Sequence, residues 1–88
     1  KDQIDEPRLY KVLLHNDNYT TMDFVVQVLE IVFCKTPAEA TRIMLNVHQQ
    51  GVGVCGTYTA EIAETKVAMV NHMAQQRGFP LKCSMEEA

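Results

Sequence analysis

The pattern of apolar and polar residues changes period twice in the first part of the chain. Along residues 9–14 the pattern alternates, with Tyr10, Val12 and Leu14 on one face and Lys11 on the other, as in a half-buried strand. A run of small polar side chains then interrupts the strand, and apolar residues resume at three-and-four spacing. We therefore predict a strand, a polar break and a helix, in that order.

Two helices are predicted in succession. The first spans about 21–34, and Thr20, with an acidic residue three positions later, resembles a capping box at its start. The second has a stronger start signal in the run Thr36-Pro37-Ala38-Glu39, because Thr can cap the helix and Pro costs nothing at its first position. It is expected to end near Gln50, where Gly51 can adopt a left-handed cap.

The rest of the chain predicts a strand, a helix and a short final strand. Residues 52–58 are β-prone but contain two glycines, which indicate a bulge or a close backbone approach. Thr59 can cap a third helix that Gly78 stops, and alternation resumes at Leu81. This order predicts an α+β fold in which a three-stranded antiparallel sheet packs against three helices, with the strands and helices in the order βααβαβ.

Composition limits the classes of function. Eighty-eight residues make one domain, here residues 8–88, preceded by a charged and polar lead-in, 1–7, that we expect to be flexible. The net charge of −3 and the absence of a Lys/Arg cluster argue against a nucleic-acid partner. Three scattered cysteines favour the cytoplasm, and no apolar run is long enough for a membrane span. Because the chain begins at Lys1, we expect a longer N-terminal extension in the natural protein.

The polar break contains the first candidate site residues, Asn16, Asp17 and Asn18. Such residues often only form turns and cap helices through their own side chains. If the two predicted helices pack side by side, however, His48 at the end of the second comes near the start of the first. The imidazole and the Asn16 carboxamide would then meet at one spot.

That spot would have an apolar floor. Met22, Val25, Met44 and Val47 occupy positions that face between the two helices. Such a stripe is usually core, but Met22 in the first helical turn is expected at a rim.

Catalysis and metal binding are poorly supported. Cys55, His48 and Asp17 can be drawn as nucleophile, base and orienting group, but nothing activates Cys55, and a lone cysteine in a strand is usually a small buried apolar residue. A metal site built from His15, His48 and a cysteine matches no common ligand spacing. The sequence therefore predicts no enzyme, no metal and no cofactor.

A larger set of residues, spread over all the predicted elements, forms a recognisable pattern. It comprises Tyr10-Lys11-Val12, Asn16-Asp17, Tyr19-Thr20, Met22, Phe24-Val25, Ala40-Thr41, Met44-Leu45, Val47-His48, Gly51, Cys55-Gly56 and the run from Thr59 to Val67. In this pattern residues 8–88 resemble the bacterial ClpS adaptor family. The resemblance implies a fold like the C-terminal domain of the ribosomal stalk protein.

The resemblance also implies a function. ClpS proteins recognise N-degrons, which are exposed N-terminal Leu, Phe, Tyr or Trp residues, and deliver their carriers to the ClpA unfoldase of the ClpAP protease. By position, Asn16, Asp17, Asn18 and His48 correspond to the α-amino site, and Glu61 and Lys66 to the surface that docks on the ClpA N-terminal domain. The side-chain pocket corresponds to Leu14, Thr20, Met22, Val25, Met44, Val47 and Leu81, with Met22 as the gatekeeper against β-branched residues. A monomer is expected.

Three departures from the family pattern suggest a variant paralogue. Asn18 stands where the family usually has a second aspartate, Thr21 replaces a proline, and His15 replaces an aliphatic residue. Losing a carboxylate lowers the negative potential beside the amine site, so weaker or narrower binding is expected. The alternative is a regulator that docks on ClpA and redirects its substrate choice without binding N-degrons.

Overall fold

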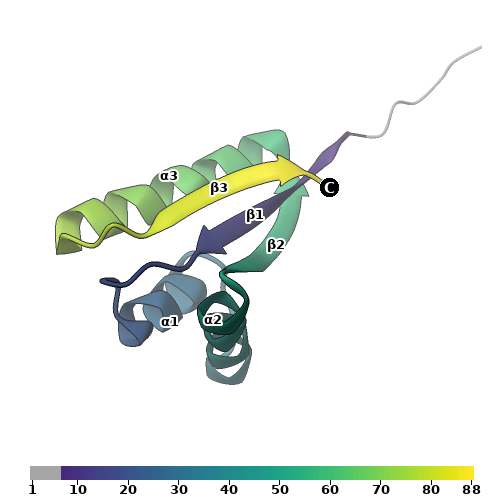
Figure 1. Cartoon of the computed structure of the whole chain (residues 1–88). Helices are drawn as coiled ribbons and strands as arrows, with labels where there is room; N and C mark the ends of the chain where they lie inside the picture. The colour runs from purple at the N-terminus through teal and green to yellow at the C-terminus, as the bar shows by residue number, and fades with distance from the viewer. Residues whose placement is uncertain (1–6) are drawn as a thin grey trace, which may run out of the picture.

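The computed structural model describes residues 7–88 as a three-stranded antiparallel sheet with three helices (Figure 1). The elements are β1 (Leu9–His15), α1 (Met22–Ile31), α2 (Pro37–Gln50), β2 (Val52–Thr59), α3 (Ala60–Arg77) and β3 (Lys82–Glu87). The predicted fold class and element order are confirmed. The lead-in predicted to be flexible lies, apart from Pro7, outside the described residues. No helix among residues 7–88 is long and apolar enough to cross a membrane.

The sheet has the strand order β2-β1-β3, so β1 is its central strand. Leu14 pairs with Gly53 on one side and Cys83 on the other, and all three residues are buried. The neighbouring row, Leu13 with its partners, is more exposed, so one face of the sheet meets the core. In Figure 1, α3 runs along the sheet, while α1 and α2 pack together where β1 ends and β2 begins.

The predicted irregularity in β2 is present as a bulge. Val12 pairs with Gly56 while Leu13 pairs with Val54, so Cys55 is the extra residue of the strand. The strand also approaches α2 closely. A Cβ placed on Gly53 would lie 2.7 Å from Cγ2 of Val47. Glycine is therefore needed at position 53 because α2 leaves no room for a side chain.

The start of α1 differs from the prediction. Thr21 is the N-cap, and its side chain accepts a hydrogen bond from the Phe24 amide. Thr20 lies one residue before the cap, and its hydroxyl is turned toward Asp17, to which it donates a hydrogen bond. The helix also ends earlier than predicted, at Ile31, and the turn that follows carries Cys34 at a positive φ of 54°.

The predicted boundaries of α2 are confirmed. Thr36 and Glu39 form the reciprocal capping box around Pro37, and Gly51 takes the left-handed conformation at the other end with φ of 88°. Thr59 occupies the N-cap position of α3 but makes no capping hydrogen bond with its side chain. Gly78 ends α3 in the left-handed conformation, as expected.

Candidate functional site

The polar segment between β1 and α1 is a turn built around one carboxylate. Oδ1 of Asp17 accepts from the amides of Tyr19, at 2.8 Å, and Thr20, at 2.7 Å, while Oδ2 accepts from the Thr20 hydroxyl at 2.7 Å. Partial burial raises the pKa of Asp17, but these hydrogen bonds outweigh it and hold the pKa below the usual value. Asp17 therefore fixes the loop and contributes negative charge.

A backbone hydrogen bond ties this turn to the end of α2. The amide of Asn16 donates to the carbonyl of Gly51 at 2.9 Å. Because Gly51 is the C-cap of α2, His48 in the last helical turn is held against the loop that carries Asn16 and Asn18. The arrangement expected from the sequence, with imidazole and carboxamide at one spot, is thus produced by the cap geometry.

The loop and the two helices enclose a cavity of about 240 Å³. Its polar side is formed by residues of the turn and by His48, and its apolar side by residues of α1 and α2. The lining consists of Asn16, Asp17, Asn18, Thr20, Met22, Val25, Met44, Val47 and His48. All nine were singled out from the sequence.

The cavity offers polar groups that have no other partner. Within residues 7–88, the side chains of Asn16, Asn18 and His48 make no hydrogen bond to another residue. A carboxamide oxygen and a neutral imidazole nitrogen are acceptors, which a protonated amine requires. Met22 is 47% exposed and stands at the rim, whereas Met44 is 9% exposed and lies deep. The site can therefore hold a cationic group next to an apolar one.

Two residues assigned to the pocket are not among the nine that line this cavity, and their assignment stays a prediction. Leu14 is fully buried in the core. Leu81 lines a small recess that adjoins the cavity, because the two share Asn16, Asp17, Thr20, Val25 and Val47. His15 lines the same recess, and its Nε2 lies 2.7 Å from the Ser84 hydroxyl oxygen on the neighbouring strand.

The sequence did not reveal one backbone contribution. The carbonyl of Gly51 holds the loop through Asn16, and only the left-handed cap predicted at Gly51 could have pointed to this contact. The close approach of α2 at Gly53, in contrast, agrees with the bulge or close approach that the glycines of this strand indicated.

The two residues assigned to partner docking lie on α3. Glu61 and Lys66 line a shallow hollow with Ile62, Thr65 and Met69, and none of these five lines the cavity. Lys66 also has an internal role. Its ammonium donates to the Val32 carbonyl at 2.7 Å and lies 5.5 Å from the centroid of the Tyr58 ring.

The buried cysteines show no sign of activation. Burial raises the pKa of the Cys55 thiol far above its usual value, and burial raises the pKa of Cys83 to about 12. Both thiols therefore stay protonated at neutral pH, and a protonated thiol is a poor nucleophile. Nothing in the geometry supports Cys55 as a catalytic nucleophile.

Comparison with known proteins agrees with the geometry. Residues 5–84 match the family model described as ATP-dependent Clp protease adaptor protein ClpS. The ClpS adapter protein of Desulfatibacillum aliphaticivorans is 70% identical to this chain, over 93% of this chain and 79% of its own length. That of Nitratidesulfovibrio vulgaris (strain Miyazaki F) is 62% identical, over 99% of this chain and 87% of its own length. The structure of Agrobacterium tumefaciens ClpS2 bound to L-phenylalaninamide superimposes with a TM-score of 0.91 at 37% identity, covering 94% of this chain and all of that one. The chain belongs to the ClpS family of adaptor proteins of the ATP-dependent Clp protease.

Proposed function

We propose that this protein is a monomeric adaptor that binds proteins whose first residue is Leu, Phe, Tyr or Trp and delivers them to the ClpA unfoldase. The observation that carries the proposal is the cavity in which unpartnered acceptors lie next to an apolar lining. L-Phenylalaninamide, the ligand of the related ClpS2, combines a free α-amino group with an aromatic side chain. The same combination suits this cavity.

The chemistry distinguishes a chain terminus from an internal peptide. A free α-amino group, with a pKa of ~7.7–8.0, is cationic and offers several donors, whereas an internal amide offers one donor and no charge. Asn16, Asn18 and His48 supply the acceptors, and Asp17 supplies negative charge. Met44 and Val47 receive the first side chain.

The expected affinity is moderate. Burial of a Leu or Phe side chain is worth ~1.5–3 kcal/mol, and each hydrogen bond to a charged group is worth a similar amount. Against this stands an association cost of at least ~4 kcal/mol. The balance places the dissociation constant near micromolar or weaker, which permits the substrate to be handed on.

The direct test is titration with fluorescent peptides. Peptides beginning with Leu, Phe, Tyr or Trp are expected to bind, whereas those beginning with Val, and acetylated forms of all of them, should bind at least tenfold more weakly. Equal affinity for free and acetylated peptides would refute an amine site. Saturable binding to ClpA without any peptide binding would instead favour a regulator that carries no N-degrons.

Single substitutions test the individual acceptors. His48→Ala or Asn16→Ala should weaken peptide binding at least tenfold while leaving the fold intact. His72→Ala and Asn71→Ala are matched controls because both residues are exposed on α3, away from the cavity. An unchanged affinity in His48→Ala would remove the imidazole from the site.

We assign docking on the ClpA N-terminal domain to the hollow on α3. Glu61 is exposed there, and Ile62 and Met69 add apolar surface that is 49% and 42% exposed. Glu61→Lys should weaken binding to the ClpA N-terminal domain without altering peptide affinity. Lys66→Ala also removes the hydrogen bond to the Val32 carbonyl. The thermal stability of this variant must therefore be measured together with its binding to ClpA.

A further inference from the structure

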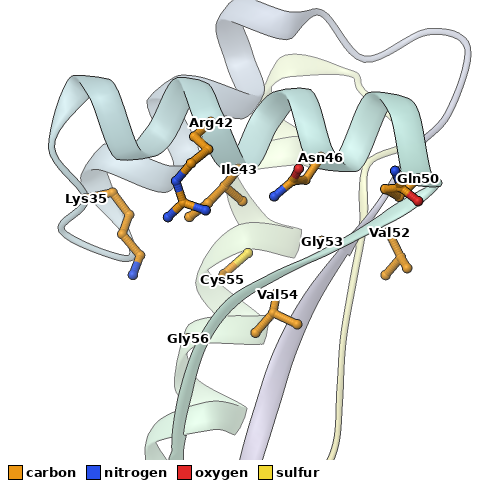
Figure 2. Close-up of a pocket in the computed structure, with 10 residues that line it drawn as sticks. All are labelled: Lys35, Arg42, Ile43, Asn46, Gln50, Val52, Gly53, Val54, Cys55 and Gly56. Carbon is orange, nitrogen blue, oxygen red and sulfur yellow. The ribbon is translucent and has the colours of Figure 1, made fainter.

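A second hollow lies on the other side of α2 and belongs to neither surface described above. It has a volume of about 610 Å³, within the range of ~300–1,000 Å³ common for ligand sites. Figure 2 shows Arg42, Asn46 and Gln50 of α2 facing the strand β2, with Lys35 at one end. None of the residues that line it lines the cavity at Asn16 and His48.

One wall of this groove is an open sheet edge. Because β1 lies in the centre of the sheet, β2 pairs on one side only, and the backbone groups on its other side face outward. Gly53 and Gly56 extend no side chain into the groove, and on the face of the sheet Gly53 packs against Val47 of α2 while the Tyr58 ring lies over Gly56. Residues 52–56 of β2 line the groove, a length that suits a short extended peptide.

The two edges of the sheet differ in how they are protected. The outer strand β3 carries Lys82, Glu86 and Glu87, and charges of this kind discourage pairing with another chain. The outer strand β2, with the sequence VGVCGTYT, has no charged residue and no proline. The bulge at Cys55 is the one feature of β2 that interrupts this edge, so a partner strand would pair regularly only on either side of it.

The charges around the groove select the partner. Lys35 and Arg42 line it and no carboxylate does, although the chain as a whole has a net charge of −3. The neighbouring carboxylate of Glu39 has its pKa lowered by its hydrogen bonds with Thr36 and further by the charges of Lys35 and Arg42, so one carboxylate stands beside two cations and the local charge stays positive. Pairing of two copies of β2 would bring the same cations together, which disfavours a homodimer.

We propose that this groove binds an acidic, extended segment of a partner protein, which adds to β2 as a fourth strand. Main-chain hydrogen bonds to the strand provide a general attraction, as in other cases of strand addition. Arg42 and Lys35 then select carboxylates at the peptide's side-chain positions, with Arg42 able to bind one in a bidentate manner. This site shares no lining residue with the cavity that the first residue of a substrate would occupy.

The probe is the acetylated and amidated hexapeptide Glu-Val-Asp-Val-Glu-Val, which has no free amine for the cavity. In titrations followed by NMR, the amide signals of residues 52–56 and the side-chain signals of Asn46 and Gln50 should shift. Binding should weaken severalfold between 50 and 500 mM salt, because exposed charges are screened. A peptide with Lys in place of the acidic residues, and an N-methylated acidic peptide that lacks amide donors, should each bind at least tenfold more weakly.

Charge reversal completes the test. Arg42→Glu should lower affinity for the acidic peptide at least tenfold, whereas Lys82→Glu, which makes the same charge change on the opposite edge, should change it less than twofold. Both variants should keep their thermal stability and their affinity for Phe-led peptides. Absence of binding, equal binding of the Lys peptide, or concentration-dependent dimerisation through β2 in sedimentation experiments would overturn the proposal.

Discussion

Substitution of Gly53 tests whether the contact between β2 and α2 shapes the binding cavity. In Gly53→Ala the new Cβ would lie 2.7 Å from Cγ2 of Val47, and 3.5 Å from the Ile43 carbonyl oxygen and from the Val47 amide nitrogen. Apolar carbons normally meet at ~3.5–4.0 Å, so Val47 has to move by about 1 Å. Overpacking of this kind costs ~1–3 kcal/mol, and a loss of about 2 kcal/mol would lower the melting temperature of a domain this size by ~8–16 °C.

The effect should reach the cavity because Val47 lines it. We expect Gly53→Ala to weaken binding of Phe-led peptides by roughly three- to tenfold. Gly78→Ala is the matched control. It introduces a side chain at φ of 74°, a strain worth ~1–2 kcal/mol, but it has open space around it and should leave peptide affinity unchanged.

A double-mutant cycle isolates the contact. Val47→Ala alone removes two buried methyl groups and should cost about 2 kcal/mol. In the double variant Gly53→Ala/Val47→Ala the methyl group of Val47 that would clash is gone. The loss of unfolding free energy in the double variant should therefore be about 1–2 kcal/mol smaller than the sum of the losses in the two single variants. Urea unfolding of the four proteins measures this coupling. If the losses of the two single variants add up to that of the double variant within about 0.5 kcal/mol, Gly53 and Val47 are not coupled and the proposed clash is refuted.

Three further predictions concern single residues. Met22→Ala should admit peptides led by Val or Ile, measured by the same titration, because it removes the half-exposed side chain at the cavity rim. Asp17→Asn should destabilise the protein by about 1 kcal/mol. Since the pKa of Asp17 is lowered on folding, this difference in unfolding free energy should be complete above about pH 5 and disappear as pH falls well below ~3.9; a difference that persists at pH 2.5 would be inconsistent with it. Cys34→Gly should stabilise the protein by about 0.5–1 kcal/mol in urea unfolding, because Cys34 has φ of 54°.

Much of the fold was accessible from local signals. The Thr36–Glu39 capping box and the left-handed glycine at position 51 are short-range features, and the structure has both where they were predicted. The start of α1 was mispredicted because Thr20 and Thr21 are both acceptable caps. In the structure the Thr20 hydroxyl donates to a nearby carboxylate, Asp17, and the Thr21 hydroxyl accepts from the Phe24 amide.

The residues that line the cavity were predicted better than its depth. Helical spacing places Met44 and Val47 toward α1, and the cavity has them there. Leu14 was assigned to the pocket by the family resemblance alone; in the structure it is fully buried in the core, and its part in the pocket stays a prediction. The depth of the cavity depends on how closely the helices approach the sheet. The contact of Gly53 with Val47 and Ile43 limits that approach, and it follows from the three-dimensional packing of β2 against α2 and not from the spacing of apolar residues.

The position of α2 links the two binding surfaces proposed for this protein. One side of the helix supplies Met44, Val47 and His48 to the cavity, and another supplies Arg42, Asn46 and Gln50 to the groove at β2. A peptide added to β2 would contact the strand that contains Gly53, and Gly53 touches Val47. If strand addition shifts α2, the affinity for Phe-led peptides should change when the acidic hexapeptide is present, and by linkage the reverse change must be of equal size. Titrating each peptide in the presence of the other measures this coupling; affinities that stay the same in the presence of the other peptide would show that strand addition leaves α2 and the cavity unchanged.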